Sequence, residues 1–178
     1  MNGGRVVLAL LQLTCSGTLQ VDSREARVFQ AAYDHYRRDH GSPVLFAPET
    51  VDPSNMPGAQ SLRLAAADPL YEELIAQNGG GFVSLRSWLS AIPSARVIPA
   101  ALLRAAPSRW PYDVERVLVF AKPVFSSDGQ TALAWVCHLD HYKPQGQAAV
   151  FVPEDLVLSL RQTDDGWRVT RVYSWSPD

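Results

Sequence analysis

The sequence predicts an α+β fold in which N-terminal helices pack on a C-terminal antiparallel β-meander. Between residues 113 and 175, short apolar runs alternate with polar turns that contain Asp-Gly, which is the strongest short-range signal for antiparallel hairpins. Between residues 22 and 40, apolar side chains recur every three or four positions, which is the period of an amphipathic helix. We therefore expect the sheet in the last third of the chain and the helices before it.

Apolar runs define the expected strands of the meander. Asp128-Gly129 and Asp165-Gly166 mark the turns of two hairpins, and a polar loop separates the middle strands. The runs cover residues 117–125, 131–137, 155–160 and 167–175.

Side chains of the second run alternate between two faces of the expected sheet. One face receives Leu133, Trp135, Cys137 and Leu139, and the other receives Ala132, Ala134, Val136 and His138. In the last run Arg171 interrupts the apolar parity, and a bulge near Thr170 would restore it. We assign the aromatic side chains to the core because aromatics dominate burial in small domains, with the wall of a cavity as the alternative.

Capping residues mark the expected helices. The first is expected to follow Asp22 and to end at Gly41, with positive charge in its last turn. The second is expected to have Asp68 as its N-cap and to end at the glycines of residues 79–81. A third is expected over residues 99–106, because Pro99 is suited to the first position of a helix.

The remaining segments complete one predicted domain. Residues 42–48 are a short apolar run bounded by prolines, which indicates an edge strand. Residues 49–60 are expected to form a loop, and residues 82–93 fit either a strand or a short helix. No repeat or linker interrupts the chain, so residues 21–178 are expected to form a single α+β domain.

Composition and charge exclude several classes of function. The 178 residues are 47% hydrophobic and 19% charged, which is ordinary for a globular protein and argues against extensive disorder. A net charge of -2 offers no basic surface for nucleic acid. The sequence has no phosphate loop, dinucleotide fingerprint or nucleophile elbow. We therefore predict no cofactor and favour a function without catalysis.

The first 20 residues resemble a secretory signal peptide. Arg5 precedes a short apolar run, and small and polar residues follow it. The run is too short to span a bilayer, so no transmembrane span is predicted. Export to the periplasm or cell envelope is the favoured interpretation, with lipidation at Cys15 as a variant of it. The alternative is an ordinary N-terminal element of a cytoplasmic protein.

Residues 137–141 contain the best candidates for chemistry. His138, Asp140 and His141 are residue types that bind zinc and similar ions, and Cys137 is a further candidate for the same site. Their spacing fits no established metal motif, so the favoured interpretation is a polar hairpin loop. Cys137 itself is expected to be an inert buried thiol, because neighbouring residues on a strand point to opposite faces and His138 is badly placed to activate it.

The C-terminal part carries a resemblance to known proteins. Its residues are 110–112, 117–129, 132–134, 165–169 and 174–176. They resemble a loose group of uncharacterised bacterial exported or lipoprotein-like proteins, and the strand pattern more loosely resembles the sheet of the NTF2-like superfamily of cone-shaped α+β proteins. Residues 138–146 stand in place of the glycine-rich loop of that group, so the resemblance implies a fold and no loop function.

Three functions remain open from the sequence. The favoured one is an exported binding or interaction domain with a protein partner or a small apolar ligand. The second is an NTF2-like cavity that binds a small molecule or has weak activity. The third is a metal-dependent enzyme that uses residues 137–141.

Overall fold

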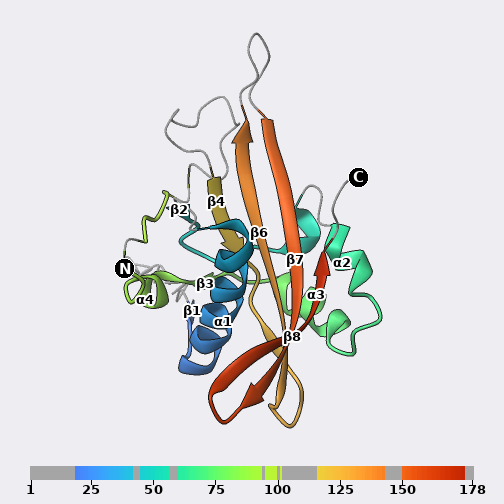
Figure 1. Cartoon of the computed structure of the whole chain (residues 1–178). Coiled ribbons are helices and arrows are strands. Elements are labelled where there is room, and N and C mark those ends of the chain that lie inside the picture. Colours follow the sequence, from blue (N-terminus) through green and yellow to red (C-terminus); the bar gives the residue numbers. More distant parts are fainter. Residues whose placement is uncertain are drawn as a thin grey trace, which may run out of the picture.

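The structure combines helices with a six-stranded mixed sheet, so the predicted α+β class is confirmed (Figure 1). It is a computed structural model that describes residues 19–41, 45–56, 60–93, 95–99, 101, 116–142 and 150–174, while the side chains of residues 19, 20, 141, 142 and 150–152 lie outside the described part. The helices are α1 (Ser23–His40), the 3-10 turn η1 (Pro53–Asn55), α2 (Gln60–Leu64), α3 (Tyr71–Asn78) and α4 (Arg86–Leu89). The strands are β1 (Leu19–Gln20), β2 (Leu45–Phe46), β3 (Val83–Ser84), β4 (Arg116–Phe120), β5 (Val124–Phe125), β6 (Thr131–Tyr142), β7 (Val150–Thr163) and β8 (Gly166–Ser174).

The predicted meander forms the body of the main sheet. Its strands run in the order β2-β4-β6-β7-β8, with β5 also paired to β6. The pairs β4–β6, β6–β7 and β7–β8 are antiparallel, whereas the edge strand β2 is parallel to β4. Positive φ angles of 71° at Gly129 and 117° at Gly166 close the two Asp-Gly turns, as the sequence predicts.

The sheet is buried on both faces, as the strand alternation predicts. One face packs against α1 and α4 and forms core cluster 1, which includes Ala132, Ala134 and Val136 of β6. The opposite face packs against α2 and α3 and forms core cluster 2, which includes Leu133, Trp135 and Cys137. Figure 1 shows α1 on one side of the long strands and α2 with α3 on the other.

Helix α1 has the ends that its sequence predicts. Asp22 caps the first turn by accepting hydrogen bonds from the amides of Arg24 and Glu25, and Glu25 reaches back to complete a capping box. Gly41, with φ of 76°, ends the helix. The apolar stripe is buried in core cluster 1, where each large side chain such as Phe29 contributes roughly 1.5–3 kcal/mol by burial.

The predicted bulge lies in β8 at Thr170. Leu160 pairs with Val169 and Ser159 pairs with Arg171, so Thr170 is the extra residue in β8. The bulge reverses the parity of the strand: Trp167 belongs to core cluster 1, whereas Tyr173 packs against core cluster 2.

Two local expectations are corrected, and one open alternative is resolved. Helix α3 begins at Tyr71, so Asp68 is not its N-cap; the Asp68 carboxylate instead accepts a hydrogen bond from the amide of Leu70 in the preceding turn. Residues 138–142 belong to β6 and not to a polar loop, because β7 pairs with them in register. The segment 82–93 contains both the strand β3 and the short helix α4.

Some expectations fall outside what the structure describes. These are the N-terminal segment 1–18 with Cys15, nearly all of the expected helix at 99–106, and residues 110–112 and 175. Among the described helices, none is both long and apolar enough to cross a membrane.

Candidate functional site

A polar cluster lies where the C-terminal turn of α1 meets the sheet. His40 comes from α1, His138 from β6 and Glu154 from β7. His138 and Glu154 are directly paired across the β6–β7 ladder, so the register places their side chains on the same face. That face is the one covered by α1, whose last turn adds His40. We call these three residues the His-His-Glu cluster.

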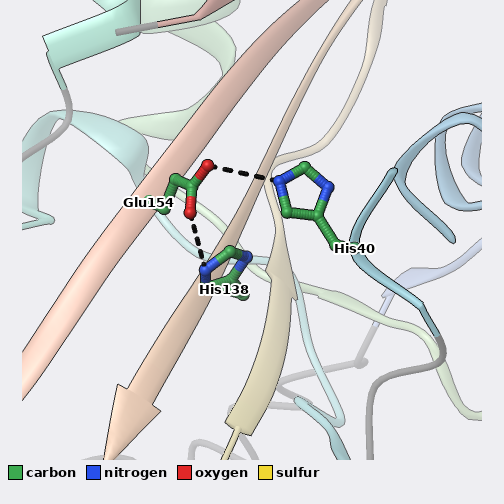
Figure 2. Close-up of side chains that lie close together, drawn as sticks. All are labelled: His40, His138 and Glu154. Atoms are coloured by element: carbon green, nitrogen blue, oxygen red, sulfur yellow. Dashed lines mark hydrogen bonds and ion pairs between the residues drawn. The ribbon is translucent and has the colours of Figure 1, made fainter. Parts of the chain in front are cut away.

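The side chains of the His-His-Glu cluster converge on one another (Figure 2). The Nε2 atom of His40 lies 3.2 Å from Oε1 of Glu154, and Nε2 of His138 lies 3.2 Å from Oε2 of the same carboxylate. One ligand atom from each residue lies within 4.8 Å of the other two. The carboxylate therefore lies between two imidazole rings from different elements.

Tyr36 holds both imidazoles in place. Its hydroxyl oxygen lies 2.8 Å from Nδ1 of His138, and its backbone oxygen lies 3.2 Å from Nδ1 of His40. The rings of Tyr36 and His40 also stack, with 4.6 Å between centroids and an interplanar angle of 2°. Each imidazole therefore has Nδ1 occupied by a partner and Nε2 directed at Glu154.

The hydrogen bond of His40 to the backbone fixes one proton position on its ring. The backbone oxygen of Tyr36 can only accept, so Nδ1 of His40 carries a proton. In the neutral ring, Nε2 then carries a lone pair, and it faces an acceptor oxygen of Glu154. Two acceptors at this separation require a proton or a metal cation between them.

His138 has more freedom, because the Tyr36 hydroxyl can either donate to its Nδ1 or accept from it. Burial lowers the pKa of His138 and outweighs the nearby carboxylates of Asp140 and Glu154, which act in the opposite direction. Burial also raises the pKa of the Tyr36 hydroxyl, which stays neutral. The neutral form of His138 is the one that binds metal ions.

Arg116 and Asp140 form an ion pair beside the cluster. Arg116 donates to both carboxylate oxygens of Asp140, at 2.6 Å from Nε and 3.1 Å from Nη2, and the two residues face each other across the β4–β6 ladder. Arg116 also donates to the backbone oxygen of His40 at the end of α1. The bond to Asp140 is the main cause of a raised pKa of Arg116. This pair fixes the end of α1 to the sheet.

The structure brings together only some of the side chains that the sequence suggests as metal ligands. Asp140 lies on the same face as His138, with 3.7 Å between Oδ2 and Nε2. The side chain of His141 lies outside the described part of the chain. Cys137 does not join the site, because it faces core cluster 2 on the opposite side of the sheet.

Sequence reasoning missed His40, Glu154, Tyr36 and Arg116. The sequence ties His40 to no other candidate ligand, and Glu154 lies just before the run 155–160 in which the strand is expected. One available signal was strand register, since extending β6 and β7 beyond the apolar runs pairs His138 with Glu154.

A separate hollow of about 370 Å³ lies on the opposite side of the sheet, beside η1, α2 and α3. Its lining combines apolar side chains such as Leu62 and Ile75 with polar ones such as Gln60 and Arg63. It shares no residue with the His-His-Glu cluster, so the two features are separate.

Comparisons with known proteins identify no family for this α+β protein, which carries a cluster of two histidines and one carboxylate. No protein-family model matches the chain, and no curated protein matches it in sequence. Among solved structures, the chain is similar to the crystal structure of the intermembrane space region of chloroplast protein ARC6. That likeness has a TM-score of 0.21 and 17% identity, covering 35% of this chain and 58% of that chain, and it carries no argument about fold or function.

Proposed function

We propose that the protein binds a divalent transition-metal ion between His40, His138 and Glu154, with zinc as the first candidate. The observation that carries the proposal is the convergence of one ligand atom from each of these residues to within 4.8 Å of the others. Two histidines and a glutamate are an established ligand set for zinc. Nitrogen and carboxylate ligands also suit iron and manganese, which the experiment below includes.

The spacing of the ligand atoms supports a tetrahedral ion. Zinc lies about 2.0–2.1 Å from nitrogen and oxygen ligands, so neighbouring ligand atoms in a tetrahedral site are about 3.3 Å apart. Both contacts between a histidine Nε2 and Glu154 measure 3.2 Å. These two contacts, to Oε1 from His40 and to Oε2 from His138, are close to the separation that a zinc ion requires, and the remaining pair of ligand atoms lies within 4.8 Å.

The partners of the two histidines support the same proposal. Metal-binding histidines usually engage the second ring nitrogen with a backbone oxygen or a polar side chain, which fixes the tautomer and the ring orientation. Tyr36 provides both kinds of partner, one for each ring. In the neutral form of His40 this arrangement leaves a lone pair directed at a carboxylate, which a metal cation between them satisfies.

Zinc affinity of the metal-free protein tests the proposal. Wild type, His40→Ala, Glu154→Gln and the control His35→Ala are compared by competition with a chromophoric chelator, all with Cys15→Ser so that this thiol does not bind zinc. We expect one zinc per chain and a loss of at least roughly 100-fold in His40→Ala and Glu154→Gln, since the loss of an outer-shell partner alone costs 10–100-fold. His35 lies on the same helix outside the cluster and contacts Arg38, so its removal is expected to leave affinity unchanged.

Equal zinc affinity in all four proteins would contradict the proposal. A wild-type protein that competes with the chelator no better than His40→Ala does would also contradict it. Manganese and iron(II) are measured in the same series. If either one binds more tightly than zinc and loses affinity in the same variants, the proposed ligands stay the same and the assigned metal changes.

The other functional expectations remain predictions. Export, a protein partner or small apolar ligand, and the resemblance to bacterial exported and NTF2-like proteins are inferred from the sequence alone. The hollow beside α2 and α3 is compatible with a small-molecule ligand, and the metal-dependent enzyme hypothesis now concerns His40, His138 and Glu154 in place of residues 137–141.

A further inference from the structure

We infer that the metal ion in the His-His-Glu cluster keeps one exchangeable coordination position and that this position takes a small anion with an oxygen or nitrogen donor, such as a carboxylate. The inference rests on the proposed metal binding and adds a second ligand to the same site. Three observations carry it: the number of protein ligands, their exposure and the local charge.

The cluster provides three ligands, one fewer than a tetrahedral ion uses. The described residues whose ligand atoms all lie within 4.8 Å of one another are His40, His138 and Glu154. Sites in which zinc has three protein ligands hold water or an exogenous ligand in the fourth position, whereas structural zinc sites are closed by four protein ligands. With the three ligands found in the described part of the chain, the site is therefore of the open type.

Exposure places the open position toward solvent. The His138 side chain is 2% exposed and forms the floor of the site, while 46% of the Glu154 side chain and 19% of the His40 side chain are accessible. A ligand from solution can therefore approach on the side of Glu154 and His40. The buried side is occupied by Tyr36, which contacts both histidines.

Charge favours an anion at that position. A divalent ion bound by two neutral histidines and one carboxylate leaves about one net positive charge. Asp140 does not cancel it, because the carboxylate is already paired with Arg116 through both of its oxygens. An anionic donor therefore gains both a coordination bond and the attraction of an incompletely neutralised cation.

Among the residues that the structure describes, Asp140 is the protein group that competes for the same position. Its Oδ2 lies 3.7 Å from Nε2 of His138, but it is outside the group of ligand atoms that all lie within 4.8 Å of one another. Arg116 holds this carboxylate and is itself fixed by the backbone oxygen of His40. Asp140 is therefore held beside the metal position rather than in it.

The test uses the full chain, again with Cys15→Ser, loaded with cobalt(II), which occupies zinc sites and has visible absorption bands that depend on coordination. Azide and acetate are titrated into wild type and Asp140→Asn, and cobalt in the dialysate is measured in parallel. We expect a saturable shift of the visible bands in both proteins, with cobalt retained and with equal or tighter anion binding in Asp140→Asn, because one nearby negative charge is removed.

The alternative outcomes are distinguishable. A shift in Asp140→Asn alone would show that Asp140 fills the fourth position and would overturn the inference. No shift in either protein, or a spectral change that accompanies loss of cobalt into the dialysate, would also overturn it. If cobalt produces no protein-dependent bands before any anion is added, the proposed metal binding itself fails.

Discussion

Two adjacent carboxylates on β7 have opposite surroundings. Glu154 faces the His-His-Glu cluster under α1, and Asp155 faces core cluster 2 under α2. Asp155 is 2% exposed, and its two oxygens accept hydrogen bonds from the Trp135 indole at 3.0 Å and from the Ser61 amide at 3.2 Å. Donors therefore satisfy Asp155 within the protein.

Glu154 lacks that kind of environment. It is half exposed, and the ring nitrogens nearest to it belong to His40 and His138. In the neutral form of His40, its hydrogen bond to the backbone leaves a lone pair on the atom that faces the carboxylate. The comparison teaches that a buried carboxylate met by N–H donors fixes one element to another, whereas a half-exposed carboxylate between two imidazole Nε2 atoms is suited to a cation.

The largest expected effect is a difference between the two carboxylates in their contribution to the free energy of unfolding. Asp155→Ala removes the acceptor of the buried Trp135 indole and leaves a void, so we expect a loss of about 2–4 kcal/mol in the free energy of unfolding. Glu154→Gln in the presence of EDTA is expected to change it by about 0.5 kcal/mol or less. Urea unfolding of both variants measures the free energy of unfolding, and equal losses of it would remove the distinction between the two carboxylates.

A second prediction sharpens the role assigned to the cluster. Tyr36→Phe removes the hydroxyl that holds Nδ1 of His138, and we expect a 10–100-fold loss of zinc affinity because outer-shell partners orient the ligand. Tyr33→Phe is the control, since Tyr33 lies one turn earlier on α1 and packs on Phe46 and Trp88. Chelator competition gives both affinities, and an equal loss in both variants would point to a general effect on α1.

The smallest expected effect concerns Cys137, the neighbour of His138 on the opposite face. Burial, with Asp155 as a weaker contributor, raises the pKa of this thiol well above its usual value. In the Cys15→Ser variant we therefore expect no reaction with a disulfide reagent at neutral pH until the protein is unfolded. Rapid labelling of the native protein would contradict the assignment of Cys137 to core cluster 2.

Much of the fold follows from local features of the sequence. Asp22 and Gly41 define the ends of α1, the Asp-Gly pairs define two turns, and the broken parity at Arg171 indicates the bulge, which the structure places at Thr170. These signals are readable because each depends on residues a few positions apart. The sequence predicts an end of β6 near Cys137, whereas the strand continues to Tyr142, because polar residues on a strand resemble a loop when the pairing strand is not known.

Sequence alone therefore determined the α+β class, the two faces of β6 and the residue types around His138. Tertiary structure alone decided which residues meet there. His40 and Glu154 are 114 positions apart, and Tyr36 and His138 are 102 positions apart. Periodicity assigns a side chain to a face of its own element, but only the packing of α1 on the sheet and the register of β6 with β7 determine its neighbours across elements.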